Sequence, residues 1–149
     1  MEYSIAILRP GDHEQFKSLL GIFATVFDRE GPAFPRGQYL ESLLNRPDFF
    51  CIIASHNQDV IGGLTVYILP SYYSEKNTAY IYDVGVLPSW QRKGVGKKLI
   101  ESLVQLGKDK GLHEIFVQAE ADDQGAIQFY RSTSLTSEIN CIQFSRDSL

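Results

Sequence analysis

Near the middle of the chain stands Tyr80-Ile81-Tyr82-Asp83-Val84-Gly85-Val86-Leu87-Pro88-Ser89-Trp90-Gln91-Arg92-Lys93-Gly94-Val95-Gly96-Lys97-Lys98-Leu99-Ile100. The part through Val86 is rich in aromatic and β-branched residues, which favour a strand. Pro88 ends that strand, and apolar residues recur at helical spacing from Gly94 onward. The stretch therefore predicts a strand, a basic turn and a helix in series.

The turn has the features of an anion-binding site. A helix N-terminus presents main-chain N–H groups without intrahelical partners and carries roughly half a positive charge. Gly94 and Gly96 leave those groups accessible to a phosphate. The polar and basic residues around them are Gln91, Arg92, Lys93, Lys97 and Lys98. An ordinary strand-to-helix turn with solvated lysines fits the same composition, so both interpretations stay open.

Two other phosphate-binding loops are excluded by single positions. A mononucleotide P-loop needs a glycine where Gln91 stands and a hydroxyl residue where Lys98 stands. A dinucleotide-binding loop needs a glycine where Leu99 stands.

The hexapeptide Gln91-Arg92-Lys93-Gly94-Val95-Gly96 resembles the acyl-CoA pyrophosphate loop of the GCN5-related N-acetyltransferase (GNAT) superfamily. Tyr67–Pro70, Ile81–Asp83 and Val117–Ala119, with the spacing onward to Tyr130, are similar to the aminoglycoside 3-N-acetyltransferase branch. The resemblance implies acetyl-CoA as co-substrate without a metal, a small-molecule amine as acceptor, and a homodimer.

Pattern and resemblance together predict a mixed α/β fold over residues 1–149 as one domain. We expect a mostly antiparallel sheet of about six to seven strands with a splayed parallel pair, flanked by about four helices. The expected strands cover residues 4–8, 49–54, 60–68, 78–86, 114–119 and 139–144. The expected helices begin at Asp12 as cap, near Tyr39, at Gly94 and near Ala126. The resemblance implies a β-bulge near residues 83–85.

The resemblance also implies the catalytic residues. Asp83 corresponds to the family's carboxylate and would be a general base or an anchor for the acceptor's ammonium group. Tyr130 corresponds to the tyrosine that donates a proton to the departing CoA thiolate. A solvated aspartate at the end of a strand and a core aromatic are the alternative interpretations of these two residues.

The implied CoA contacts come from two strands, the turn and the last helix. They are Val84, Val86, Gln91, Arg92, Lys93, Gly94, Val95, Gly96, Lys97, Ala126 and Tyr130, together with the main chain around Ala119.

The acceptor is predicted from an acidic group of residues after the parallel strand. Glu120, Asp122 and Asp123, with Asp83, would offset the charge of a cationic amine, although loop carboxylates of this kind are often only solvated. The chain departs from the resembled branch at Gln124-Gly125, at Ser134-Leu135 and at its C-terminal edge, where Arg146 would repel a polycation. We therefore expect weak recognition of aminoglycosides.

Composition narrows the class of protein. A net charge of −4 argues against a nucleic-acid partner. No apolar run approaches the ~20 residues of a membrane span, and Met1-Glu2-Tyr3 opens no signal peptide, so we expect a cytoplasmic protein without a membrane partner. Cys51 and Cys141 both stand in apolar runs and are expected to be buried thiols.

Three functions fit the sequence. The first is acetyl transfer from acetyl-CoA to a primary amine of a small cationic acceptor, such as an aminoglycoside or a polyamine. The second is a protein or peptide N-acetyltransferase of the same fold. The third is a non-catalytic acyl-CoA-binding module.

Overall fold

The computed structural model describes residues 2–29 and 34–149. Its elements are β1 (Ser4–Ile7), α1 (His13–Val26), α2 (Gly37–Leu44), β2 (Phe49–His56), β3 (Asp59–Pro70), β4 (Asn77–Val86), the 3₁₀ turn Pro88–Trp90, α3 (Val95–Lys110), β5 (Glu114–Val117) and α4 (Gln124–Arg131). The predicted order of strands and helices up to α4 is confirmed.

The strands form one mixed sheet in the order β1-β2-β3-β4-β5. The first four strands pair antiparallel, and β5 pairs parallel with β4. The predicted mixed α/β class, the parallel pair and the number of α-helices are confirmed. The predicted strand count is too high, because five strands form in the described chain. The strand expected at residues 139–144 is absent, since that segment makes no sheet pairing.

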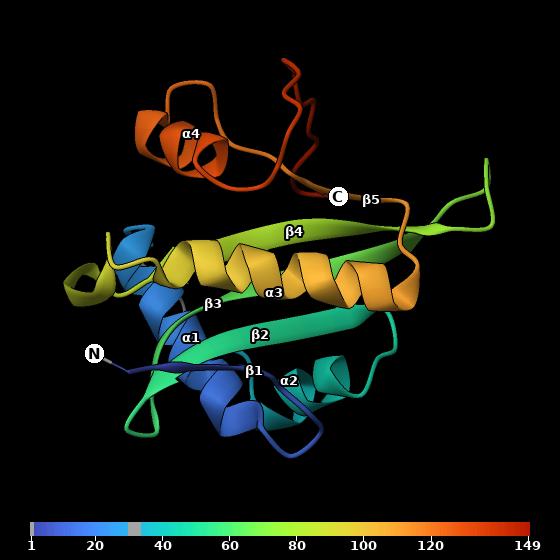
Figure 1. Ribbon diagram of the computed structural model, residues 1–149. Coiled ribbons are helices and arrows are strands. Elements are labelled where there is room, and N and C mark those ends of the chain that lie inside the picture. The colour runs from blue at the N-terminus through green and yellow to red at the C-terminus, as the bar shows by residue number, and fades with distance from the viewer. Residues whose placement is uncertain (1, 30–33) are drawn as a thin grey trace.

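Two hydrophobic cores lie on opposite faces of the sheet. On one face, α3 packs against β2, β3 and β4. On the other face, α1 packs against β3 and β4, and α2 packs against β2. Figure 1 shows α3 across one face, α1 and α2 on the other, and α4 with the chain after it beyond β5. The two helices of the second face therefore cover β2, β3 and β4.

The helical stripes explain this packing. Phe16, Leu19 and Phe23 recur at helical spacing on α1 and are all buried. On α3 the buried stripe runs from Val95 through Leu99 and Leu103. Gly107 lies inside the helix, and Gly111 is its C-cap, with φ 67.

A tight turn fixes the register of β2 and β3. Asn57 and Gln58 both have positive φ, as a two-residue hairpin turn requires. His56 and Asp59 face each other across this turn. The strands expected at residues 49–54 and 60–68 therefore form a hairpin.

The irregularity in β4 lies one residue before the predicted bulge. Thr65 faces Asp83 while Val66 faces Ile81, so Tyr82 is the extra residue of β4. Gly85 serves packing instead, because a Cβ there would stand 2.8 Å from the ring of Phe23. The glycine thus allows α1 to approach the strand.

Two further predictions are wrong in detail. Cys141 is exposed, because the segment around it is not part of the sheet, whereas Cys51 is buried as expected. Asp12 is the N-cap residue of α1, yet its side chain does not cap the helix. Its carboxylate accepts a hydrogen bond from the Arg9 N–H at 2.8 Å.

Within the described ranges, no helix is both long and apolar enough to span a bilayer.

Candidate active site

The parallel strands separate where the predicted reaction site lies. Pairing between β4 and β5 ends at Ile81 and Val117. From Tyr82 to Val86, β4 pairs with β3 alone. The side of β4 that faces β5 therefore offers main-chain groups beyond the point of separation, as the resemblance implied for Val84 and Val86. An extended thioester arm could bind such groups as an added strand does.

The turn before α3 leaves its main-chain donors free. In the described structure, the first hydrogen bond into this helix runs from the Lys98 N–H to the Gly94 carbonyl at 3.0 Å. Among the described residues, the N–H groups from Arg92 to Lys97 have no main-chain acceptor. Arg92 and Gly94 have φ of 60 and 83, and such turns direct several N–H groups toward one side. This arrangement suits a pyrophosphate.

The two glycines of the turn have different roles. At Gly94 an added Cβ would meet nothing within 4 Å, so its surroundings are open. At Gly96 an added Cβ would lie 2.7 Å from the Phe129 ring of α4. The missing side chain at Gly96 therefore makes room for α4, and the contact of both glycines with a phosphate stays a prediction. Val95 is buried, so only its main chain can face a ligand.

Gln91 joins the turn to the strand before it. Its Nε2 donates to the Val86 carbonyl at 2.9 Å. This bond satisfies a strand-end carbonyl and holds the turn beside the separated part of β4. Among the basic residues, Lys93 lies over the Trp90 ring, with Nζ 5.4 Å from the ring centroid. Arg92 and Lys97 are exposed, as side chains that screen a phosphate would be.

Asp83 lies at the separated part of β4 with its side chain 18% exposed. Arg29, at the end of the described chain after α1, approaches it at 3.6 Å. Burial raises the pKa of the Asp83 carboxyl, and the Arg29 charge opposes this in part. A carboxylate with a raised pKa is a stronger base than a solvated one. Sequence reasoning missed Arg29, because nothing in its local pattern points toward a strand more than 50 residues away.

Tyr130 comes to the same place from α4. The pKa of its hydroxyl is raised to about 12. Burial is the largest cause, and the negative charges of Asp83 and Asp123 raise the pKa further. The structure thus brings the two predicted catalytic residues near enough to interact electrostatically. A hydroxyl with this pKa keeps its proton at neutral pH and can donate it to a thiolate.

A cavity of about 200 Å³ opens beside Asp83. Its walls come from α1, α2, β2, β3 and β4, and most are apolar or aromatic. Tyr39, Tyr67 and Tyr82 line it together with Asp83, which is the one charged residue among the lining residues. Tyr39 belongs to α2, the helix that the sequence predicts near this residue.

The acidic residues after β5 lie apart from that cavity's lining. Glu120 and Asp122 are exposed loop residues. Asp123 is the N-cap of α4, and its Oδ1 accepts a hydrogen bond from the Ala126 N–H at 3.0 Å. The main-chain donor of Ala126, a predicted CoA contact, is therefore already used by this cap.

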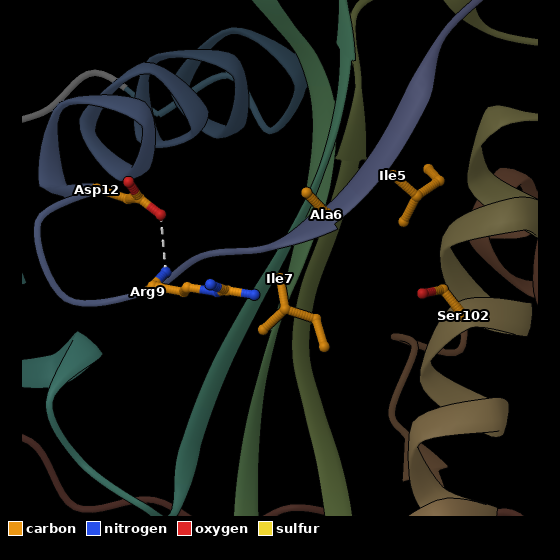
Figure 2. Close-up of a pocket in the computed structure, with 6 residues that line it drawn as sticks. All are labelled: Ile5, Ala6, Ile7, Arg9, Asp12 and Ser102. Carbon is orange, nitrogen blue, oxygen red and sulfur yellow. Dashed lines mark hydrogen bonds between the residues drawn. The ribbon is translucent and has the colours of Figure 1, made fainter.

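A larger depression, of about 600 Å³, lies at the opposite edge of the sheet. Figure 2 shows Ile5, Ala6 and Ile7 of β1 on one side and Ser102 of α3 on the other. Its polar contact is the turn hydrogen bond between Arg9 and Asp12. We see no acid–base pair there, so the smaller cavity beside Asp83 is the better candidate.

No group of three metal-ligating side chains occurs among the described residues.

Comparison with known proteins gives a consistent result. The model of the acetyltransferase (GNAT) family matches residues 16–133. The crystal structure of the aminoglycoside acetyltransferase meta-AAC0020, from an uncultured soil metagenomic sample and in complex with trehalose, is 40% identical with a TM-score of 0.96. That match covers 99% of this chain and 97% of the other. The same protein in complex with sisomicin is 39% identical, with the same coverage and TM-score.

A curated relative is more distant. Mycothiol acetyltransferase of Arthrobacter sp. (strain FB24) is 28% identical over 90 residues, which is 60% of this chain. The match spans only 28% of that relative's length.

Proposed function

Because this chain belongs to the acetyltransferase (GNAT) family and is an acyltransferase, we propose that it moves the acetyl group of acetyl-CoA to a primary amine of a small cationic acceptor. The observation that supports the proposal is the place of Asp83 where β4 and β5 separate, close enough to Tyr130 for its charge to raise the pKa of that hydroxyl. The free N–H groups of the turn before α3 lie at the end of the same strand. One site thus combines an acid, a base and an anion-binding turn.

The co-substrate fits the main chain of the described residues. The N–H groups of residues 92–97 suit its pyrophosphate. The unpaired side of β4 between Tyr82 and Val86 suits the amide groups of the pantetheine arm. Main-chain donors near the thioester carbonyl would stabilise the negative charge that develops on its oxygen.

The reaction proposed is direct attack. An ammonium group bound beside Asp83 loses a proton to that carboxylate, and the neutral amine attacks the thioester carbon. A nitrogen–carbon bond forms and the carbon–sulfur bond breaks. The departing thiolate takes the proton of the Tyr130 hydroxyl, which is still protonated because its pKa is raised to about 12. Each proton thus has a named donor and acceptor.

The cavity beside Asp83 suits an amine carried on a compact, partly apolar body. Tyr39, Tyr67 and Tyr82 can contact a cation through their ring faces, and Asp83 offers the opposite charge. The guanidinium of Arg29, 3.6 Å from the Asp83 carboxylate, would repel a second positive charge on the acceptor close to the amine bound at Asp83. Glu120 and Asp122 lie outside the cavity lining, where they would attract additional amines of a longer acceptor.

An assay of the CoA thiol released from acetyl-CoA in the presence of an amine tests the proposal. We expect turnover of sisomicin and spermidine with a high KM for sisomicin, and a further rise in KM with salt, since exposed charge pairs are screened over a Debye length of about 8–10 Å. Changing Asp122 and Asp123 together to Asn should raise both KM values while leaving acetyl-CoA affinity intact. Asn at position 123 can still cap α4, so the helix is preserved.

Either of two outcomes would contradict the proposed function. A clear preference for a short peptide over both amines would favour a peptide N-acetyltransferase. Binding of acetyl-CoA with no turnover of any acceptor would favour an acyl-CoA-binding module. The Asp83→Asn variant serves as the control for catalysis, because it should bind acetyl-CoA yet lose most of its turnover.

A further inference from the structure

The end of α1 fixes the position of Arg29 beside Asp83. Phe27 is the C-cap residue of this helix, and Asp28 follows it in the left-handed region, with φ 50. The Arg29 N–H then donates to the Ala24 carbonyl at 3.0 Å. This bond spans five residues, as in a Schellman motif. The helix end therefore anchors the main chain of Arg29, whatever its side chain contacts.

The Arg29 side chain makes two weak contacts. Its guanidinium carbon lies 5.3 Å from the centroid of the Phe27 ring. Its Nη2 lies 3.6 Å from Oδ1 of Asp83, whereas a hydrogen-bonded arginine–carboxylate pair is closer, at about 2.7–2.9 Å. The side chain is also 59% exposed, and exposed ion pairs contribute little to stability. Arg29 can therefore turn from Asp83 into solvent at little cost.

Asp83 has the opposite character. Its side chain is mostly buried, and it is the one charged residue among the described residues that line the acceptor cavity. A carboxylate with so little access to water needs a counter-ion. In the described structure that counter-ion is the Arg29 guanidinium. The ammonium group of an acceptor needs the same carboxylate, so the acceptor and Arg29 compete for one partner.

We propose that Arg29 is a displaceable counter-ion that selects the acceptor, neutralising Asp83 in the empty cavity and yielding that carboxylate to an ammonium group when an acceptor binds. The inference rests on the proposed function, because it takes the cavity beside Asp83 as the acceptor site. Every acceptor must replace the contact with Arg29, which lowers its affinity. An acceptor with a second ammonium group close to the first loses more, because the displaced guanidinium stays tethered to α1 and repels it.

A supporting role for Arg29 has the opposite consequence. If the guanidinium oriented the Asp83 carboxylate for the acceptor, removing its charge would weaken the binding of amines. Because Arg29 instead competes with the acceptor, removing its charge strengthens that binding, and most of all for closely spaced diamines. The sign of the change in affinity separates the two roles.

The variant Arg29→Gln tests the competition, because glutamine keeps a polar side chain and removes the charge. The probes are propylamine and 1,3-diaminopropane, which share one carbon chain and differ by one ammonium group. NMR titration of the CoA-bound protein at neutral pH measures their dissociation constants, and CoA carries no acetyl group to transfer. We expect Arg29→Gln to lower the constant for propylamine by about 2- to 5-fold and that for 1,3-diaminopropane by about 5- to 20-fold.

Two control variants separate the charge from its position. Arg29→Lys keeps the charge and should bind both amines as wild type does. Arg9→Gln removes the same charge at an exposed position, beside the depression at the opposite edge of the sheet, and should also match wild type. The bond that Asp12 accepts from Arg9 comes from its main chain, so this control keeps the turn.

Four results would overturn the proposal. They are equal dissociation constants in wild type and Arg29→Gln, weaker binding of both amines in that variant, the same gain in affinity in Arg29→Lys, and no binding of either amine to wild type. The titration does not depend on acetyl transfer. If both amines bind as expected but neither is acetylated when acetyl-CoA is supplied, the proposed function fails while the competition at Asp83 stands.

Discussion

The turn before α3 and the cavity beside Asp83 are built in opposite ways. The turn consists of consecutive residues, and its ligand groups are main-chain N–H donors between Arg92 and Lys97. The cavity draws its walls from two helices and three strands, and its character comes from side chains such as Tyr39, Tyr67 and Asp83. One is local and carried by the backbone, while the other is assembled across the chain.

This difference bears on how the two halves of the reaction are specified. A backbone site needs only the right conformation and enough room, so many side chains are compatible with it. A cavity of side chains changes its ligand whenever one wall residue changes. We therefore expect the turn to identify the co-substrate and the cavity to select the acceptor. Four variants probe this division, from the largest expected effect to the smallest.

Gly94→Glu should have the largest effect. It places a carboxylate among the free N–H groups, and a like-charge conflict of several kcal/mol with the pyrophosphate should weaken acetyl-CoA binding by ~10²–10³-fold. Gly111→Glu is the matched control. Gly111 also has positive φ and open surroundings, so it carries the same backbone cost at the other end of α3. Calorimetry should find binding lost in the first variant and kept in the second. Equal affinities in both would remove the turn from the co-substrate site.

Tyr130→Phe should reduce kcat by ~10²-fold, because the ring stays and only the proton donor is lost. Acetyl-CoA affinity should stay near that of wild type, which separates chemistry from binding. Tyr73→Phe, at a residue that is 89% exposed, controls for loss of a hydroxyl in general. If Tyr130→Phe keeps full activity in the thiol-release assay, Tyr130 is only a packing residue of α4.

Tyr82→Ala should raise the KM for the amine by about 2- to 5-fold, since one ring contact with a cation is worth about 0.5–1 kcal/mol at an exposed site. The affinity for acetyl-CoA should not change. Tyr72→Ala removes an exposed ring outside the cavity and should leave both constants unaltered. A rise in acetyl-CoA Kd with no change in amine KM would mean that Tyr82 belongs to the co-substrate half.

Asp83→Asn should have the smallest of the four expected effects, a slight increase in the free energy of unfolding. Burial raises the pKa of the Asp83 carboxyl, so the folded state holds this proton more tightly than the unfolded state. The stability it contributes is present below the ordinary aspartate pKa of about 4 and is lost as pH rises through the raised value. At neutral pH the variant should be more stable by less than about 1 kcal/mol.

Urea unfolding at neutral and acid pH measures this difference. The stability advantage of Asp83→Asn should shrink as pH falls, because the Asp83 carboxyl of the wild type then becomes protonated and loses its charge. If the variant is instead less stable at neutral pH, the contact with Arg29 outweighs the cost of burial.

The elements that the sequence predicted correctly are those whose signal is local. The stripe of Phe16, Leu19 and Phe23 fixes a helix by spacing alone. The polar turn at Asn57 and Gln58 fixes a hairpin. Pro88 and the glycines after it determine where β4 ends and where α3 begins. In each case the neighbours in sequence are also the neighbours that determine the conformation.

The errors share a different cause. Gly96 was expected to lack a side chain for the sake of a phosphate, and only the packing of α4 shows that the missing side chain also makes room for Phe129. Gly85 was assigned to the bulge, whereas it makes room for Phe23 of α1. A glycine in the sequence shows that the position has no side chain, but it does not show which neighbouring group fills the space. The apolar run at residues 139–144 resembles a strand, yet a strand forms only where an edge is available to pair with it.

The sequence alone determined the strand, turn and helix around Gly94, and with them the conformation that leaves N–H groups free for an anion. Tertiary structure decided which side chains meet there. Asp83 and Tyr130 are 47 positions apart, and only the packing of α4 near β4 brings the Asp83 charge close enough to raise the pKa of the Tyr130 hydroxyl. The reason is physical: backbone conformation follows from neighbouring residues, whereas a cavity or a pair of interacting charges exists only after distant segments have packed.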